Sequence, residues 1–195
     1  MVSHGHQIRD NVMFNNKDAQ MGFSDFSNYN GPGAAYPFAL PGYDDIYTNN
    51  TCYAMSNTQM CILAVNRWYN GVDFGTFANN KYHNPWNGNS FMIQKFVPSY
   101  DITYHGLASW LSIQGDETGS SNSPLSLVYP NGVVDNILVY NDSLSTQVKP
   151  LQGIWFDLDG NQYVNSITLD AFRSKVLVRA AGSFQGKVML EGPLS

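Results

Sequence analysis

The sequence predicts a mostly β protein in two parts: a solenoid of stacked coils closed by one short helix, and a small antiparallel β-sandwich. Three observations predict this class. Helical periodicity is confined to one short stretch, polar pairs followed by an aromatic residue recur before residue 100, and short strands separated by tight turns fill the second half. We therefore expect sheets throughout and a single helix at the junction.

The composition is that of a folded, weakly charged protein. Of the 195 residues, 43% are hydrophobic and only 13% are charged, with a formal net charge of -5. A chain of this kind can bury a core, and it has no basic surface for nucleic acid or anionic lipid. No apolar stretch is long enough to cross a membrane as a helix. We therefore expect neither nucleic acid nor a membrane span.

The two halves differ in asparagine content. Fifteen of the 21 asparagines precede residue 101. A shift of this size indicates two structural units. We predict coils over residues 1–100, a capping helix and linker over 101–120, the sandwich over 121–182, and the start of a further module or a tail over 183–195.

A repeated step of two polar residues followed by an aromatic one organises the first half. It occurs at Asp10–Phe14, Asn49–Tyr53 and Asn79–Tyr82, at separations of 39 and 30 residues. In a solenoid, asparagine suits the corner of a coil because it tolerates left-handed backbone geometry, and its amide can bond the asparagine of the next coil. The aromatic residue would then point inward and stack. Asparagine-rich loops of another β protein are the alternative interpretation.

One helix is predicted over Tyr104–Gln114, where Leu107, Trp110 and Leu111 fall at helical spacing. Asp101 or Thr103 could cap its start, and Gly115 could end it. We expect its apolar side to cover the carboxyl end of the coils.

The second half contains short strands separated by turns. The turns are expected at Asn131-Gly132, residues 141–143 and residues 159–161. The strands are expected at Leu125–Tyr129, Val133–Tyr140, Gly153–Leu158, Gln162–Val164, Ser166–Leu169 and Lys175–Arg179. Short strands at this spacing are typical of an antiparallel sandwich.

Several segments of the first half resemble a known architecture. Ile8–Asn16 resembles a coil of the right-handed parallel β-helix, the fold of pectate lyases and many other polysaccharide-active proteins. Residues 71–86 resemble the closing coils of such proteins, and residues 104–117 resemble the segment that follows the last coil. The resemblance implies that residues 1–100 are terminal β-helix coils.

The second half carries a resemblance of its own. Residues 137–141, 155–161 and 166–178 are similar to the small β-sandwich appended to secreted bacterial glycosidases and β-helix proteins. Residues 186–193 resemble the opening of a further module in type IX-secreted multidomain proteins. The resemblance implies a secreted or cell-surface protein, with polysaccharide and further modules or neighbouring subunits as partners.

Candidate catalytic residues are weak. Hydrolysis of a polysaccharide needs two converging carboxylates, and Asp44 and Asp45 are the best candidates of the first half. Adjacent residues on a strand point to opposite faces, so a solvated turn is the preferred interpretation. A lyase would need Arg67 or Lys81 beside an acidic cluster that the sequence lacks. An enzyme, if this is one, would be a glycoside hydrolase or polysaccharide lyase.

No metal or other cofactor is expected. Asp157–Asn161 begins like a calcium loop, but Thr168 stands where the full loop needs an acidic residue, which favours a hairpin turn. Cys52 and Cys61 are interpreted as buried thiols, with a disulfide left open.

Aromatic residues in asparagine- and glycine-rich turns are candidates for carbohydrate binding, because exposed rings stack on sugars. They are Trp68, Tyr69, Tyr82 and Trp86. Core packing is the alternative interpretation of these rings.

Three functions follow from the sequence. The first is an extracellular carbohydrate-associated module that caps and links a secreted β-helix protein. The second is a glycoside hydrolase or lyase with its groove on the coils, and the third is an adhesin or structural solenoid. A first coil with nothing stacked on it would expose the apolar residues Ile8, Val12 and Phe14. We therefore also expect that coil to be covered by more solenoid.

Overall fold

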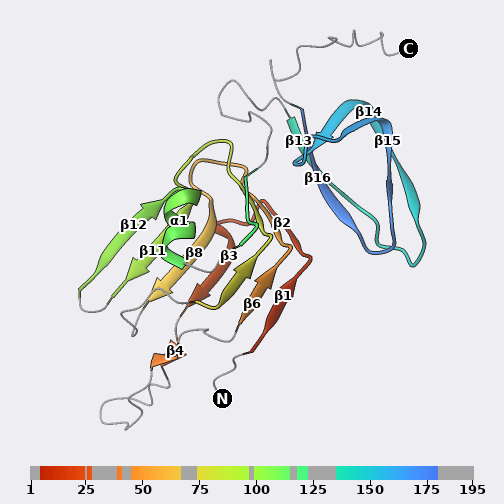
Figure 1. The fold of residues 1–195 in the computed structure, drawn as a ribbon. Helices are drawn as coiled ribbons and strands as arrows, with labels where there is room; N and C mark the ends of the chain where they lie inside the picture. Colours follow the sequence, from red (N-terminus) through yellow and green to blue (C-terminus); the bar gives the residue numbers. More distant parts are fainter. Residues whose placement is uncertain are drawn as a thin grey trace. The chain divides into compact units, whose positions relative to one another are not determined.

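The computed structural model describes residues 5–24, 26–27, 39–40, 45–66, 74–96, 99–114, 118–122 and 135–179. Sixteen strands and one helix occupy these residues, so the mostly β class is confirmed (Figure 1). The chain divides into two compact units, Met1–Asn122 and Ser123–Ser195.

The first unit is built from three successive sets of three strands, which we call tiers. Each tier contributes one strand to each of three sheets. Tier 1 contains β1 (Gln7–Arg9), β2 (Val12–Phe14) and β3 (Ala19–Ser24); tier 2 contains β6 (Ile46–Thr48), β7 (Thr51–Tyr53) and β8 (Met60–Asn66); tier 3 contains β9 (Thr76–Ala78), β10 (Lys81–His83) and β11 (Phe91–Lys95). A short antiparallel pair, β4 (Phe26–Ser27) with β5 (Ala39–Leu40), comes between the first two tiers.

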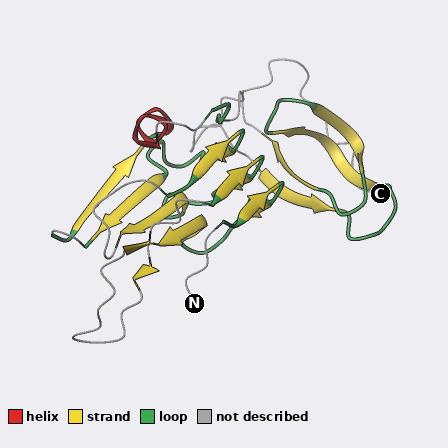
Figure 2. Ribbon diagram, turned by 60° about the horizontal axis from the view of Figure 1, so that its bottom comes forward, coloured by secondary structure: helices red, strands yellow, loops and turns green. Residues whose placement is uncertain are grey.

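Neighbouring tiers pair in parallel, so strands far apart in the sequence lie side by side (Figure 2). Ile8, Tyr47 and Phe77 occupy one register position in the sheet of β1, β6 and β9. A parallel connection needs a long crossover, which explains why the repeats are 30 or more residues apart.

The corners between the first two strands of each tier share one geometry. Asp10, Asn49 and Asn79 have positive φ values of 58°, 57° and 54°, and each precedes an asparagine. The first residue of the pair therefore makes the left-handed turn, and the second is free to bond between tiers.

The second asparagines form the predicted ladder. The backbone N–H and side-chain amide of Asn50 donate to Oδ1 of Asn80 at 2.9 and 3.1 Å. Those of Asn11 donate to Oδ1 of Asn50 at 3.2 and 3.0 Å. Asn50 and Asn80 are fully buried, and their amides also donate to Ile8 and Tyr47 carbonyls of the preceding tier. Each buried amide is thus satisfied, as burial requires.

A fourth corner was not predicted because it lacks asparagine. Gly119 has a φ of 70°, and the hydroxyl of Ser120 accepts the N–H of Asn80 at 2.9 Å. Thr118 and Ser121 form isolated parallel bridges to Ala78 and Lys81. This short segment ends the ladder with a hydroxyl in place of an amide.

Aromatic rings fill the interior between the sheets. Tyr47 stacks on Phe77 with centroids 4.7 Å apart, and Phe23 and Trp110 contact the same cluster. Tyr82 points into this interior, and its ring lies edge-on to Phe91 at 5.0 Å rather than on an earlier corner aromatic. Phe14 and Tyr53 stack at 5.7 Å, but the next ring in that register is His83, because tier 3 has one fewer residue between corner and ring.

The helix α1 spans Leu107–Gln114, three residues later at its start than predicted. Tyr104 belongs to β12 (Asp101–His105), which pairs antiparallel with β11, so neither Asp101 nor Thr103 caps the helix. Gly106 accepts the N–H of Trp110 at 3.0 Å and begins the first turn. The predicted stop at Gly115 lies outside the described residues.

Trp110 is the side chain through which α1 joins the core. It is fully buried and stacks on Phe91 at 5.3 Å, while Leu107 and Leu111 pack against the same cluster. Together with β12 and residues 118–122, the helix covers tier 3, as the apolar spacing predicted.

The described strands of the second unit form one antiparallel sheet in the order β13-β16-β14-β15. They are β13 (Asp135–Tyr140), β14 (Gln147–Asp157), β15 (Gln162–Leu169) and β16 (Ser174–Arg179). The strands predicted at 162–164 and 166–169 are one strand, and β14 is longer than predicted, with a register shift between Pro150 and Ile154. The expected strand at 125–129, the turn at 131–132 and the segment 183–195 lie outside the described residues.

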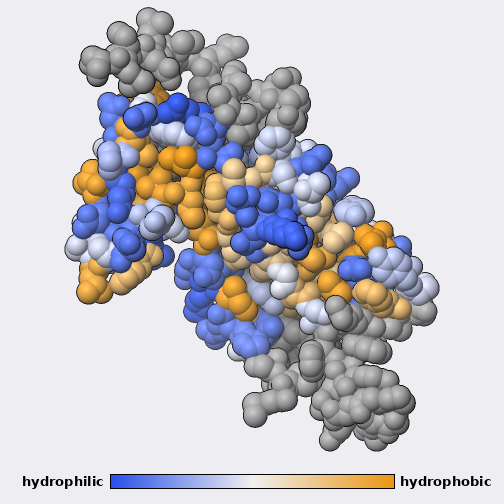
Figure 3. Space-filling model, turned by 180° about the vertical axis from the view of Figure 1, so that it is seen from behind, coloured by the Kyte–Doolittle hydropathy of each residue, from blue (hydrophilic) through white to orange (hydrophobic). Residues whose placement is uncertain are grey.

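Trp155, Ile167, Leu169 and Leu177 form the core of the second unit. Hydrophobic residues also reach its surface, where Val148 on β14 is 64% exposed and Val164 on β15 is 46% exposed. Figure 3 shows hydrophobic residues gathered on this unit between hydrophilic ones.

The first prediction concerns the ladder. Asn50→Ala should lower the free energy of unfolding by about 3 kcal/mol, because several buried hydrogen bonds worth about 1 kcal/mol each are lost. Urea unfolding measures this. Asn89→Ala, at an exposed asparagine, is the matched control and should change little. Equal midpoints for the two variants would contradict a stabilising ladder.

The second prediction concerns the fourth corner. Gly119→Ala should destabilise the chain by about 1–3 kcal/mol, because a Cβ at this positive φ would overlap the side-chain oxygen of Asn79. Gly88→Ala, where a Cβ meets nothing within 4 Å, should be neutral. Thermal unfolding of both variants tests the expectation, and an unchanged midpoint for Gly119→Ala would refute it.

Candidate functional site

Three exposed aromatic side chains lie on β12 and on the connection between β11 and β12. We call Phe96, Tyr100 and Tyr104 the aromatic surface; they are 43%, 62% and 53% exposed. Phe91 and Ile93 of β11 are buried, so the alternating residues Met92 and Gln94 face outward.

Pairing between β11 and β12 sets the positions of these rings. Tyr104 lies opposite Met92, and Ile102 lies opposite Gln94, on the outward side. Continuing the same register places Tyr100 opposite Phe96, and their rings are in edge-to-face contact at 5.2 Å. Cross-strand pairing therefore collects side chains that the sequence separates.

The aromatic surface is held in place by polar contacts. The amide of Gln94 donates to the hydroxyl of Tyr100 at 3.2 Å, and the N–H of Phe96 donates to the Asn66 carbonyl at 2.7 Å. A supported ring needs little further ordering when it binds a ligand. Apolar ring faces beside amide and hydroxyl groups can stack on the C–H face of a sugar and bond its hydroxyls.

Sequence reasoning missed this surface. The two aromatic residues Phe96 and Tyr100 lie close together in the sequence, but only the β11–β12 register shows that they face each other. The stretch from Tyr104 had instead been assigned to the helix.

The four predicted carbohydrate-binding residues are placed differently. Tyr82 is fully buried with its ring 5.0 Å from Phe91, so it is a core residue with no face open to a sugar. Trp86 is half-buried, and its backbone N–H donates to Oδ1 of Asn84 at 3.0 Å. Trp68 and Tyr69 lie outside the described residues.

The weak catalytic candidate Asp45 is not a solvated turn residue. Its Oδ1 accepts the backbone N–H of His6 at 2.8 Å and lies 2.9 Å from the ring Nδ1 of His6. Its Oδ2 accepts the Tyr47 hydroxyl at 3.5 Å. Burial and the charge of Asp45 raise the pKa of Tyr47. Asp45, just before β6, thus joins tier 2 to the start of tier 1 through its hydrogen bonds with His6. Asp44 lies outside the described residues.

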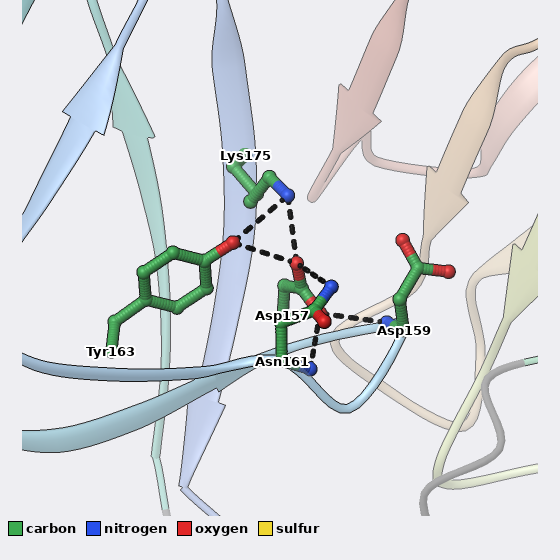
Figure 4. Close-up of polar contacts among 5 residues, drawn as sticks. All are labelled: Asp157, Asp159, Asn161, Tyr163 and Lys175. Atoms are coloured by element: carbon green, nitrogen blue, oxygen red, sulfur yellow. Dashed lines mark hydrogen bonds and ion pairs between the residues drawn. The ribbon is translucent and has the colours of Figure 1, made fainter.

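A polar cluster of the second unit surrounds Asp157 (Figure 4). Its Oδ1 accepts the N–H groups of Asp159 and Asn161 at 3.0 and 2.9 Å. Its Oδ2 accepts the Asn161 amide, the Tyr163 hydroxyl and the Lys175 ammonium at 3.0, 2.9 and 2.7 Å. The ammonium occupies the position that a cation would need, and Gly160 makes the turn with a φ of 85°. The hairpin interpretation of this segment agrees with the geometry.

Buried titratable groups lie in the interior of the first unit. Cys52 and Cys61 are both buried thiols, and burial raises the pKa of the Cys61 thiol to about 12. Burial lowers the pKa of His83 to about 4, so its ring is neutral at pH 7. Within the described residues, no group of three or more His, Cys, Asp or Glu side chains is arranged to hold a metal ion.

The described helix is too short and too weakly apolar to cross a membrane. No protein-family model, curated protein or solved structure matches this chain.

The third prediction concerns Asp157 and pH. Burial by itself raises the pKa of this carboxyl, but the hydrogen bonds from Lys175, Asn161 and Tyr163 lower it to about 2. A carboxyl whose folded pKa is lowered contributes stability above its unfolded pKa and loses that stability as the pH falls. Asp157→Asn should therefore cost roughly 2 kcal/mol at pH 7.

This cost should shrink as the pH falls from 4 to 2, because the carboxyl of the unfolded chain takes up a proton in this range while the folded carboxylate stays ionised down to about pH 2. Denaturant titrations across that range measure it, with the exposed Asp142→Asn as the control. A difference between Asp157→Asn and the unchanged chain that is constant from pH 7 to pH 2 would rule out this charge effect.

Proposed function

We propose that this chain is a carbohydrate-associated part of a secreted polysaccharide-active protein, in which it caps and links a right-handed parallel β-helix. The three tiers are its terminal coils, and the second unit is the appended β-sandwich. The aromatic surface binds the polysaccharide. The parallel pairing of strands 30 and 39 residues apart supports the coil assignment.

The observation that carries the binding proposal is the aromatic surface itself. Soluble proteins rarely leave several rings of one face in water unless that face binds something. Here the rings come with an ordered amide from Gln94, and one of them carries a hydroxyl bonded to that amide. A polysaccharide offers both C–H faces and hydroxyl groups, and it matches this mixture of apolar and polar contacts.

A capping role is supported by the closed end of tier 3. Trp110 fills the interior beside Phe91, and β12 pairs with the outer edge of β11. Thr118 and Ser121 extend the other two sheets by a single bridge each. Elements of this kind end a stack of strands and prevent its open edges from pairing with other molecules.

We do not propose a catalytic role for this chain. Asp45 is engaged by His6 and Tyr47, and a hydrolase would need a second carboxylate opposite a free one. A structural solenoid or adhesin would use the tiers without needing the aromatic surface for a sugar. Binding measurements separate these functions.

The fourth prediction tests the aromatic surface. The full chain should bind at least one member of a panel of plant, algal and bacterial polysaccharides in affinity electrophoresis. The double substitution Phe96→Ala and Tyr100→Ala should weaken binding by about tenfold or more, since each lost aromatic contact is worth about 1 kcal/mol.

The matched control is the double substitution Phe172→Ala and Tyr140→Ala in the second unit, where both side chains are also exposed. It should bind as the unchanged chain does. Equal losses in both double variants, or no binding to any polysaccharide, would contradict the proposal.

A further inference from the structure

The two ends of the tiered stack differ in how their strand edges are paired. At tier 3, each of the three strands is bridged on its outer side by β12, Thr118 or Ser121. At tier 1, β1, β2 and β3 each have only one partner strand among the described residues. Their outer edges therefore present backbone N–H and C=O groups with no strand to bond.

The asparagine ladder is also incomplete at this end. Oδ1 of Asn50 and Oδ1 of Asn80 each accept two N–H groups from the preceding tier. Oδ1 of Asn11 accepts no hydrogen bond from the described residues, and Asn11 is exposed. The side-chain amide of Asn11 donates to the backbone carbonyl of Arg9, in its own tier, at 3.0 Å. The corresponding amides of Asn50 and Asn80 instead donate to a backbone carbonyl of the preceding tier.

Two apolar residues of tier 1, Met13 and Phe14, are half-buried at positions where tier 2 is fully buried. Met13 is partly exposed, whereas Cys52 and Tyr82 in the same register are 0% exposed. Phe14 is partly exposed, whereas Tyr53 beneath it is 0% exposed. The described residues thus leave backbone edges, a ladder acceptor and part of the Phe14 ring uncovered at this end.

We infer that the outer edge of tier 1 is a docking surface for one further tier of parallel strands. The corner residue of this tier donates its backbone N–H and a side-chain amide to Oδ1 of Asn11. The amide of Asn11 then leaves Arg9 and donates to a carbonyl of the incoming strand, as Asn50 does to Ile8. This inference rests on the proposed assignment of the tiers to coils of one solenoid, and the occupant is a further parallel tier of such a solenoid that bears an amide at its corner.

Polarity excludes a second copy of the described residues as this occupant. A parallel addition to tier 1 must present the outer edge of a last tier, and in this chain that edge is already used by β12, Thr118 and Ser121. Two copies meeting at their first tiers would pair antiparallel, which would separate their corners and give Asn11 no ladder donor.

The test compares the full chain with a version extended by one tier. A copy of residues 45–73 placed directly before Gly5 enters in register, because Gln7, Ile46 and Thr76 occupy one position in successive tiers. Amide hydrogen exchange of Val12 and Phe14 is the measurement. Their N–H groups point to the free edge, since Asn11 and Asn15 bond toward tier 2.

In the unextended chain these two amides should exchange quickly, and sedimentation should show a monomer. In the extended chain their exchange should slow at least about tenfold, as for amides inside a sheet. Asn11→Ala should lower the unfolding midpoint of the extended chain more than that of the unextended chain. Only in the extended chain does Oδ1 of Asn11 accept hydrogen bonds from the corner of the added tier. Polysaccharide binding should be the same in both chains, so failure here is distinct from failure of the proposed function.

Three outcomes would overturn the inference. Unchanged exchange in the extended chain would show that the edge does not accept a parallel tier. Protection that grows with concentration in the unextended chain would identify a second copy as the occupant. Slow exchange in a monomeric unextended chain would show that the edge is covered by the chain itself.

Discussion

The hydrogen-bonded ladder that joins Asn11, Asn50 and Asn80 is the interaction on which the first unit depends. A buried side-chain amide is costly unless all its donors and acceptors are satisfied, and these residues satisfy one another only when successive corners are aligned. Because strand residues alternate between faces, a slip of one position would turn the apolar side chains outward. The ladder therefore fixes the register of the sheets beside it.

That register decides which side chains meet. Tyr47 lies on Phe77 and Phe14 on Tyr53 because their strands are aligned from the corner, and Phe23 closes the space between the sheets. On the outer side, the alternation of β11 leaves Gln94 beside Tyr100. The same strand register therefore determines both the inward ring contacts and the outward contacts of the proposed binding surface.

Two carboxylates whose sequence positions drew attention as a possible catalytic or metal-binding group have structural roles in the fold. Asp45 holds His6 and so joins two tiers, and Asp157 organises a turn with Lys175 on its second oxygen. Both are nearly buried and use their oxygens on donors from the same unit. A carboxylate whose oxygens are taken in this way is poorly placed to act on a substrate.

The amino-acid order was enough to predict the β class, the corners at residues 10, 49 and 79, and the helix around Trp110, because these depend on local backbone preference and on spacing along the chain. It did not determine that His83 follows Tyr53 in the ring stack, that Tyr104 belongs to a strand, or that Phe96 meets Tyr100. Those facts depend on which strand pairs with which, and in what register. Pairing between distant segments is decided by the packing of the whole unit, and local preference carries no information about it.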